Sequence, residues 1–77
     1  MDVLYIVVPC YNEEEVLPET SSRLKEKMER LIESGKIASK SRVIFVNDGS
    51  KDRTWEIIRQ LHTSESLFGG INLSCNR

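Results

Sequence analysis

Two short, continuous apolar runs constrain the fold of this chain more than any other feature of its sequence. LYIVV covers residues 4–8 and VIFV covers residues 43–46, and neither run alternates polar with apolar residues. Continuous runs of this kind are typical of strands covered on both faces, which occur in parallel sheets. Parallel neighbours need a long crossover connection, usually a helix. The two runs therefore predict an α/β fold.

The segment between the runs has the pattern of an amphipathic helix. Pro18 fits a first helical turn but not a helix interior, so we predict a short turn at residues 13–16 and the main helix from about Pro18. Asn12, with Glu15 three residues later, is a plausible N-cap in a capping-box arrangement. Gly35 is the expected end of the helix. The apolar positions fall on one stripe at helical spacing: Leu17, Leu24, Met28, Leu31 and Ile32.

The rest of the chain predicts one more helix and one more strand. A second helix is expected from Asp52 or Thr54, with Trp55, Ile58 and Leu61 on its apolar side. Residues 63–70 are interpreted as a loop, and INLSCN at residues 71–76 as a third strand. The order is β-α-β-α-β, a Rossmann-like three-stranded parallel sheet. Two right-handed crossovers in the same direction put both helices on one face of that sheet.

The opposite face of this sheet would have no cover. Strands that read as buried on both sides need a second layer, and no residues remain to form it. Large exposed apolar faces are rare in monomers. We therefore interpret residues 1–77 as a single domain that is the N-terminal portion of a longer, doubly wound domain. The other possibility is that the chain self-associates through its uncovered sheet face.

Composition excludes several classes of function. Eleven Lys and Arg residues stand against twelve Asp and Glu, without a basic surplus, so nucleic-acid binding is not expected. Cys10 and Cys75 have no CxxC spacing and His62 is the single histidine, so no metal site is predicted and both thiols are expected to be reduced. No apolar run approaches the ~20 residues that span a membrane, and no signal peptide is present. These features predict a cytoplasmic, soluble chain.

Polar residues follow each apolar run at the point where a strand would end. In open α/β sheets, ligands bind outside the carboxyl ends of the strands. Asp48 followed by Gly49 is either a tight turn or a ligand contact. Ser50 and Asp52 offer oxygens to the first N–H groups of the next helix. Glu13 is either an acid in the first turn of a helix, where the helix dipole favours it, or a second ligand contact.

The two strand-end motifs together resemble family 2 inverting glycosyltransferases, which have the GT-A nucleotide-diphospho-sugar transferase fold. That family begins with a strand leading into Pro-x-Tyr-Asn-Glu, which VVPCYNEEEVLPET matches here. Its second strand ends in Val-Asp/Asn-Asp-Gly-Ser-x-Asp-x-Thr, which VIFVNDGSKDRT matches. Both motifs occur in order and at the expected separation, and the resemblance covers essentially the whole chain.

The resemblance implies a nucleotide pocket and its residues. Pro9, Tyr11 and Glu13 would line the pocket near the base and ribose, and a Tyr at a strand end is a ready stacking surface. Asp48 would accept a hydrogen bond from uracil or guanine, and Gly49 would allow close backbone approach. Ser50 and Asp52 would mainly order the loop. The implied partner is a UDP- or GDP-sugar, from which a hexose passes to an acceptor.

The tail INLSCNR resembles the subgroup that acts on polyprenyl and dolichyl phosphates, which implies a polyprenyl phosphate acceptor and a longer parent protein at the cytoplasmic face of a membrane. In the family, an Asp-x-Asp motif holds Mg²⁺ or Mn²⁺, and it lies further along together with the general base. This chain has no such pair. The parent is therefore expected to use Mg²⁺ or Mn²⁺, while residues 1–77 have no catalytic residue, hold no metal and are expected to be inactive.

Other functional classes are less well supported by the sequence. A receiver-like binding switch needs an acidic pair after the first strand and a late lysine; Glu13 and Glu15 could imitate the pair, but no lysine follows Lys51. A dinucleotide-binding half needs GxGxxG after the first strand, where this chain has PCYNEE. A non-catalytic assembly module that dimerises through the uncovered face stays open.

Overall fold

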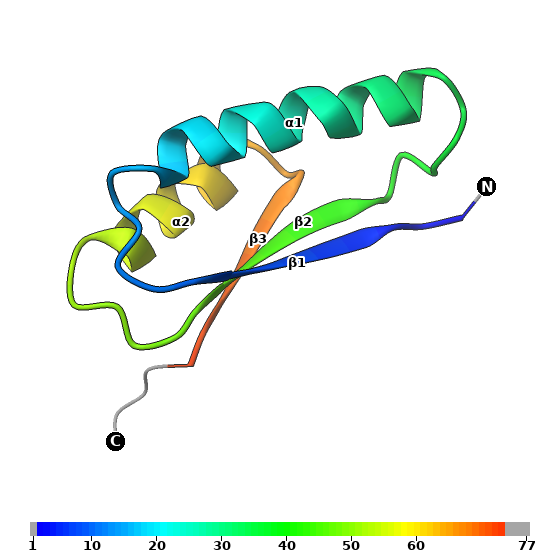
Figure 1. Ribbon diagram of the computed structural model, residues 1–77. Coiled ribbons are helices and arrows are strands. Elements are labelled where there is room, and N and C mark those ends of the chain that lie inside the picture. The colour runs from blue at the N-terminus through cyan, green and yellow to red at the C-terminus, as the bar shows by residue number, and fades with distance from the viewer. Residues whose placement is uncertain (1, 74–77) are drawn as a thin grey trace.

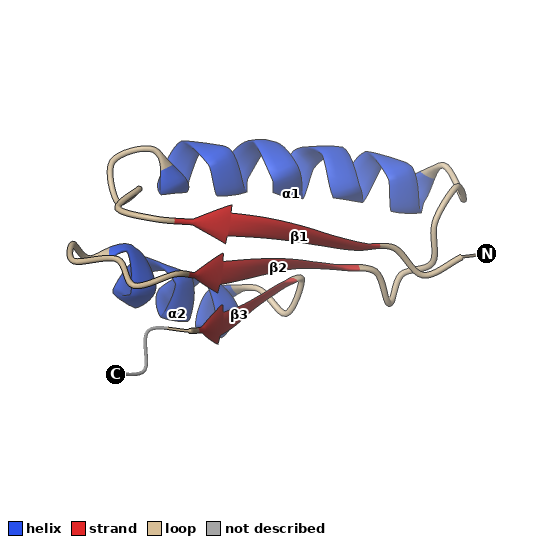
Figure 2. Ribbon diagram, turned by 60° about the horizontal axis from the view of Figure 1, so that its bottom comes forward, coloured by secondary structure: helices blue, strands red, loops and turns tan. Residues whose placement is uncertain are grey.

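A computed structural model describes residues 2–73 of the chain. The strands form one parallel sheet in the order β1-β2-β3, and both helices lie on the same face of it (Figures 1 and 2). The predicted fold class is confirmed. Residues 74–76 of the expected third strand, and Cys75, lie outside the described residues. The elements are β1 Tyr5–Cys10, α1 Leu17–Glu33, β2 Arg42–Asn47, α2 Thr54–Ser64 and β3 Phe68–Asn72.

The core lies between the sheet and the two helices. In β2, Val43, Phe45 and Asn47 are buried and alternate with half-buried residues. The rings of Phe45 and Phe68 lie 5.5 Å apart between centroids, which joins the middle and edge strands. Helix α1 contributes Leu17 and Met28 from the predicted stripe, both fully buried. Leu24, Leu31 and Ile32 pack against this core from the same helix.

The start of α1 differs from the prediction in one respect. The expected turn is present, because the N–H groups of Val16 and Leu17 donate to the Glu13 carbonyl at 3.1 and 2.9 Å. The capping box of Asn12 and Glu15 is wrong. Val16 is the N-cap, without a side-chain hydrogen bond. Asn12 has φ 52°, in the left-handed region, and its side-chain oxygen accepts the N–H of Lys51 instead.

The end of α1 is where the sequence places it. Gly35 has φ 77°, a conformation that favours glycine. Its N–H donates to the Ile32 carbonyl at 3.0 Å, and the Lys36 N–H donates to the Leu31 carbonyl at 3.0 Å. This pair of bonds is the Schellman arrangement, which satisfies carbonyls that the helix itself leaves without donors.

Strand β3 begins three residues earlier than predicted, and the proposed loop at residues 63–70 is wrong. Helix α2 continues to Ser64, and the strand starts at Phe68. Gly69 and Gly70 look like loop residues in the sequence, yet both lie in the strand. A Cβ on Gly70 would lie 2.4 Å from Cγ2 of Ile58 and 3.2 Å from Cζ3 of Trp55. The missing side chain therefore lets α2 pack directly on β3.

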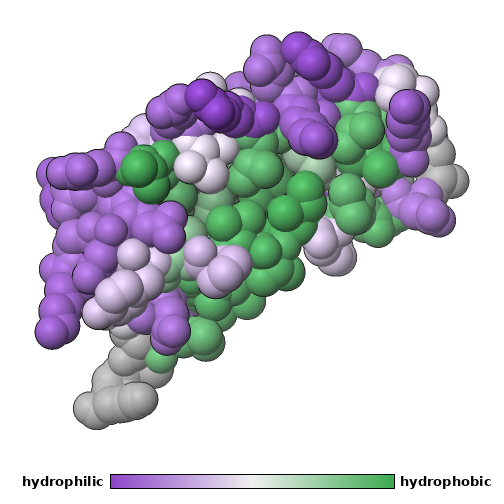
Figure 3. All heavy atoms as spheres, viewed as in Figure 1, coloured by the Kyte–Doolittle hydropathy of each residue, from purple (hydrophilic) through white to green (hydrophobic). Residues whose placement is uncertain are grey.

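The face of the sheet opposite the helices has no cover among residues 2–73. Tyr5 and Val7 of β1 are 62% and 61% exposed, and Ile71 of β3 is 49% exposed. Figure 3 shows an apolar surface along the strands, below the hydrophilic outer side of α1. This exposed apolar face matches the prediction that these strands are built for a second layer. Neither α1 nor α2 is long and apolar enough to cross a membrane.

Candidate functional site

The candidate site lies where β1 and β2 end next to each other. Cys10 and Asn47 are partners in the parallel register. Immediately after them, the N–H of Asp48 donates to the Cys10 carbonyl at 3.0 Å. The loop after β1 and the loop after β2 therefore leave the same edge of the sheet side by side (Figure 1). This is the edge at which open α/β sheets bind ligands.

Three consecutive N–H groups of the first loop donate to side-chain oxygens of the second. The acceptors are two hydroxyl oxygens and one carboxylate oxygen. Each of the three amides therefore has a partner in the second loop or at the first residue of α2. The bonds are Asn12 N–H to Ser50 Oγ at 2.9 Å, Glu13 N–H to Thr54 Oγ1 at 2.8 Å, and Glu14 N–H to Asp52 Oδ2 at 3.1 Å.

Two further bonds run in the opposite direction. The N–H of Lys51 donates to Asn12 Oδ1 at 2.7 Å, and the N–H of Arg53 donates to Glu14 Oε1 at 3.2 Å. We call these two bonds and the three above the loop clamp. Because each loop supplies both donors and acceptors to the other, neither loop can change its conformation alone.

Thr54 and Asp52 form the centre of the loop clamp. Thr54 is fully buried; its hydroxyl accepts the Glu13 N–H and donates to Asp52 Oδ1. Oδ1 of Asp52 also accepts the Thr54 N–H at 3.0 Å, at the start of α2. Desolvation acts to raise the pKa of Asp52, but the hydrogen bonds from Thr54 and from the Glu14 N–H lower it below its ordinary value. The ionised carboxylate is therefore the form that the clamp holds.

The predicted structural roles of Asp52 and Ser50 are present, with one correction. Asp52 does serve the first turn of α2. Ser50 does not, since its hydroxyl oxygen accepts the Asn12 N–H from the other loop. The reason is position: Ser50 precedes Thr54, the first helical residue, by four positions, and the first loop lies closer to it than the helix does.

The clamp uses none of the side chains predicted to contact a nucleotide; from Glu13 it takes only the backbone N–H. Within the part of the chain that the structure describes, the carboxylates of Asp48 and Glu13 accept no hydrogen bond and form no ion pair. Asp48 is exposed, and Tyr11 is 54% exposed. Gly49 has φ 76°, with no atom within 4 Å of where a Cβ would stand. Pro9 is exposed at the end of β1.

Asn47 and Cys10 form the floor of the site. Asn47 is buried, and its side chain accepts the Ser50 N–H at 3.4 Å and donates to Asn72 Oδ1 at 3.0 Å, so it links the second loop to β3. Burial and, to a smaller extent, the Glu13 carboxylate raise the pKa of the Cys10 thiol to about 11. Cys10 is therefore a protonated core residue and not a nucleophile.

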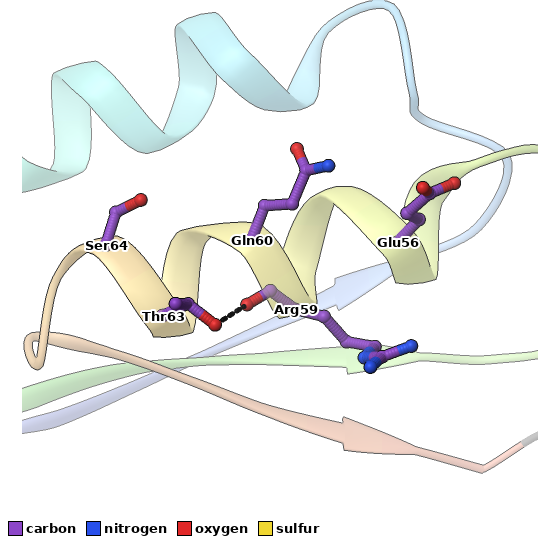
Figure 4. A pocket seen from close by; sticks show the side chains of 5 residues that line it. All are labelled: Glu56, Arg59, Gln60, Thr63 and Ser64. Carbon is purple, nitrogen blue, oxygen red and sulfur yellow. Dashed lines mark hydrogen bonds between the residues drawn. The ribbon is translucent and has the colours of Figure 1, made fainter.

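Two of the surface hollows are places where a ligand could lie. One, of about 370 Å³, lies against the clamp and is lined by Asn12, Glu13, Glu14, Glu15, Val16 and Asp52. A larger one, of about 500 Å³, lies on the outer side of α2 (Figure 4). Its lining residues all come from that single helix, and their side chains point in different directions. The first hollow is formed by both loops at the strand ends, and Glu13 is the predicted contact residue that lines it; the placement of the site there rests on the sheet topology.

The described residues do not fit a metal ion. Residues 2–73 contain no group of three His, Cys, Asp or Glu side chains that could hold one. No chemical step is therefore assigned to a metal on these residues.

Sequence reasoning gave no binding or positioning role to Thr54, Asn47 or Asn12. Thr54 was considered only as the start of a helix, and Asn12 only as an N-cap. The available signal was the presence of two polar runs at adjacent strand ends, because neighbouring loops rich in side-chain oxygens can accept each other's backbone N–H groups.

Comparisons with known proteins agree with this geometry. Residues 5–77 match the family described as Glycosyl transferase family 2. An uncharacterized glycosyltransferase of Bacillus subtilis, YkoT, is 51% identical over 96% of this chain. A prophage bactoprenol glucosyl transferase homolog of Escherichia coli is 35% identical over 92%, and an uncharacterized glycosyltransferase of Synechocystis is 40% identical over 95%. The chain spans 21–22% of the length of these relatives.

Proposed function

The chain belongs to glycosyl transferase family 2, and we propose that its strand-end loops bind the nucleotide of a UDP- or GDP-sugar. In this proposal the whole protein is an inverting transferase that passes a hexose from that donor to an acceptor. Residues 1–77 supply the nucleotide-binding portion of its catalytic domain. Pro9, Tyr11, Glu13, Asp48 and Gly49 are the proposed contact residues.

One observation carries the proposal: the carboxylates of the two aspartates after β2 differ in whether they accept hydrogen bonds. Asp52 accepts hydrogen bonds from Glu14 and Thr54, whereas Asp48 accepts none from the described residues. A carboxylate left without partners at a ligand-binding sheet edge is available to a donor on a ligand. Uracil and guanine each present an N–H at the ring edge. A charge-assisted bond from that group to Asp48 is the recognition step that we propose.

The neighbouring residues suit the rest of a nucleoside. Tyr11 follows Cys10, whose carbonyl accepts the Asp48 N–H, so Tyr11 and Asp48 stand next to each other in the backbone pairing. An exposed aromatic ring beside a carboxylate can stack on a base while the carboxylate bonds to its edge. The open space above Gly49 lets a ribose or phosphate approach the backbone closely.

The acceptor class is proposed from the relatives. The Escherichia coli relative and a Shigella phage relative, which is 34% identical over 92% of this chain, are both named as bactoprenol glucosyl transferases. Bactoprenol is a polyprenyl lipid, so we propose a polyprenyl phosphate as acceptor. Such an acceptor would place the whole protein at the cytoplasmic face of a membrane.

Catalysis itself requires groups that the described residues do not offer. We propose that the whole protein uses Mg²⁺ or Mn²⁺ to stabilise the leaving diphosphate. In this proposal the metal site and the general base lie further along the whole protein, so the purified 77-residue chain is expected to bind nucleotide without transferring sugar.

Isothermal titration calorimetry of the 77-residue chain with UDP and GDP tests the proposal. The expected result is binding of one of them, weakened roughly 10- to 150-fold in Asp48→Ala, since a hydrogen bond to a charged group contributes about 1.5–3 kcal/mol. Asp48→Asn keeps an acceptor oxygen but loses the charge, and should fall between the two. Glu33→Ala, an exposed acid at the far end of α1, is the matched control. Equal affinity in Asp48→Ala and the control would overturn the role of Asp48.

A further inference from the structure

We infer that Thr54 and Asp52 are positioning residues that set nucleotide affinity through the loop clamp without touching the nucleotide. The inference rests on the proposed function, because it concerns the same site. It gives these two residues a role beyond ordering the start of α2. They hold the first loop, which carries Tyr11 and Glu13, in register with the second loop, which carries Asp48 and Gly49.

Burial separates Thr54 from any ligand. Its side chain is fully buried, and both hydrogen-bonding capacities of its hydroxyl are used inside the protein, on the Glu13 N–H and on Asp52 Oδ1. Removing the hydroxyl would leave the Glu13 N–H without its acceptor. Because an unsatisfied amide is unfavourable, the first loop would move to find water or another partner. Any effect on a nucleotide therefore passes through the position of Glu13.

The bonds of Asp52 are more than a helix N-terminus needs. The N-cap of α2 is Arg53, which makes no side-chain cap bond, and Oδ1 of Asp52 serves the helix start by accepting the Thr54 N–H. Oδ2 instead reaches across to the Glu14 N–H, 38 positions earlier in the chain. The second oxygen therefore serves the relation between the loops and not the helix. Asn has a single acceptor oxygen in its side chain, so it cannot take the place of Oδ1 at the Thr54 N–H and of Oδ2 at the Glu14 N–H together.

The second loop has few other restraints. Gly49 has open space on its Cβ side, and Asp48 is held only through its backbone N–H to Cys10. The Ser50 N–H bond to Asn47 is long, at 3.4 Å. The clamp bonds at Ser50 and Lys51, directly after this turn, are the shorter ones, at 2.9 and 2.7 Å. Hence the position of the Asp48 turn depends on the clamp.

The test compares Thr54→Val with Thr54→Ser in the 77-residue chain. Val has the shape of Thr without its hydroxyl, and Ser keeps the hydroxyl. We expect Thr54→Val to weaken the binding of UDP or GDP about tenfold, while Thr54→Ser stays within about twofold of wild type. Amide hydrogen exchange should speed up at Asn12, Glu13 and Glu14 in Thr54→Val. It should stay slow along β2, which distinguishes a moved loop from a weakened fold.

The outcomes separate the two proposals. If wild type binds neither UDP nor GDP, the proposed function fails first. If wild type binds and Thr54→Val binds equally well, or if Thr54→Ser loses as much affinity as Thr54→Val, the positioning role is overturned. Should Thr54→Val not fold, Ser50→Ala and Ser50→Thr make the same comparison at the more exposed clamp bond from the Asn12 N–H. Retained affinity in Ser50→Ala would then overturn the inference.

Discussion

Gly70→Ala is predicted to destabilise the fold through a single contact. The added Cβ would stand 2.4 Å from Cγ2 of Ile58, well inside van der Waals distance, and 3.2 Å from the Trp55 ring. Ile58 is 1% exposed and β-branched, so neither its backbone nor its χ1 angle can yield easily. Helix α2 must therefore move away from β3, or β3 must bend.

The size of the effect follows from two opposing contributions. Overpacking a well-filled core costs about 1–3 kcal/mol, and the rigid neighbour puts this site at the upper end. Replacing Gly by Ala recovers about 0.4–1 kcal/mol from the unfolded chain. The net loss is about 2 kcal/mol, which corresponds to a fall in Tm of roughly 8–16 °C for a domain of this size. A chain of this length has roughly 4–12 kcal/mol of stability in all.

Urea unfolding followed by tryptophan fluorescence is the suitable assay, because Trp55 is the single tryptophan and lines the contact. Gly69→Ala is the matched control. Its Cβ would meet only Cδ1 of Ile44, at 3.0 Å, the far end of a flexible, half-buried side chain on the uncovered face. A loss of stability in Gly70→Ala no larger than that in Gly69→Ala would refute the packing explanation for the two glycines in β3.

Two further predictions concern Asp52 and the uncovered face. The clamp lowers the pKa of Asp52 below its ordinary 3.8, so the stabilisation from its carboxylate is present above pH 3.8 and is lost as the pH falls through the folded-state pKa. In urea titrations, the difference in stability between wild type and Asp52→Asn should therefore shrink on acidification. A difference that is unchanged at about pH 2 would contradict this. The uncovered sheet face should make the 77-residue chain self-associate in sedimentation equilibrium, and Val7→Lys should yield monomers. The control is Val16→Lys, because Val16 is also apolar and is 52% exposed but lies off the sheet. A monomeric wild type would refute the expectation.

The elements were predictable where one local pattern decides them. The buried runs became β1 and β2, the apolar stripe became the inner side of α1, and Gly35 ends that helix in a left-handed conformation. Strand β3 was misjudged because Gly69 and Gly70 look like chain breakers. Their actual reason is the close approach of α2, a tertiary contact that no local window contains.

The adjacency of the two strand-end loops was predictable, but the bonds between them were not. Parallel strands bring their carboxyl ends to one edge, so the polar residues there had to be neighbours. Asn12 fits the local signature of an N-cap, yet its side chain bonds to Lys51, 39 positions later. The other clamp bonds join residues 38–41 positions apart. No local window contains both partners of such a bond, so local propensity could not predict them.

The clamp also explains how one short run can carry a structural aspartate, Asp52, and the aspartate proposed to bind the ligand, Asp48. The backbone amides of both loops find acceptors in Asn12, Glu14, Ser50, Asp52 and Thr54. None of these five amides uses the carboxylate of Asp48, which is left to water or to a ligand. Losing Asp48 should therefore lower affinity without lowering stability, whereas losing Asp52 should lower both. The two aspartates, four positions apart, thus separate recognition from the scaffold that supports it.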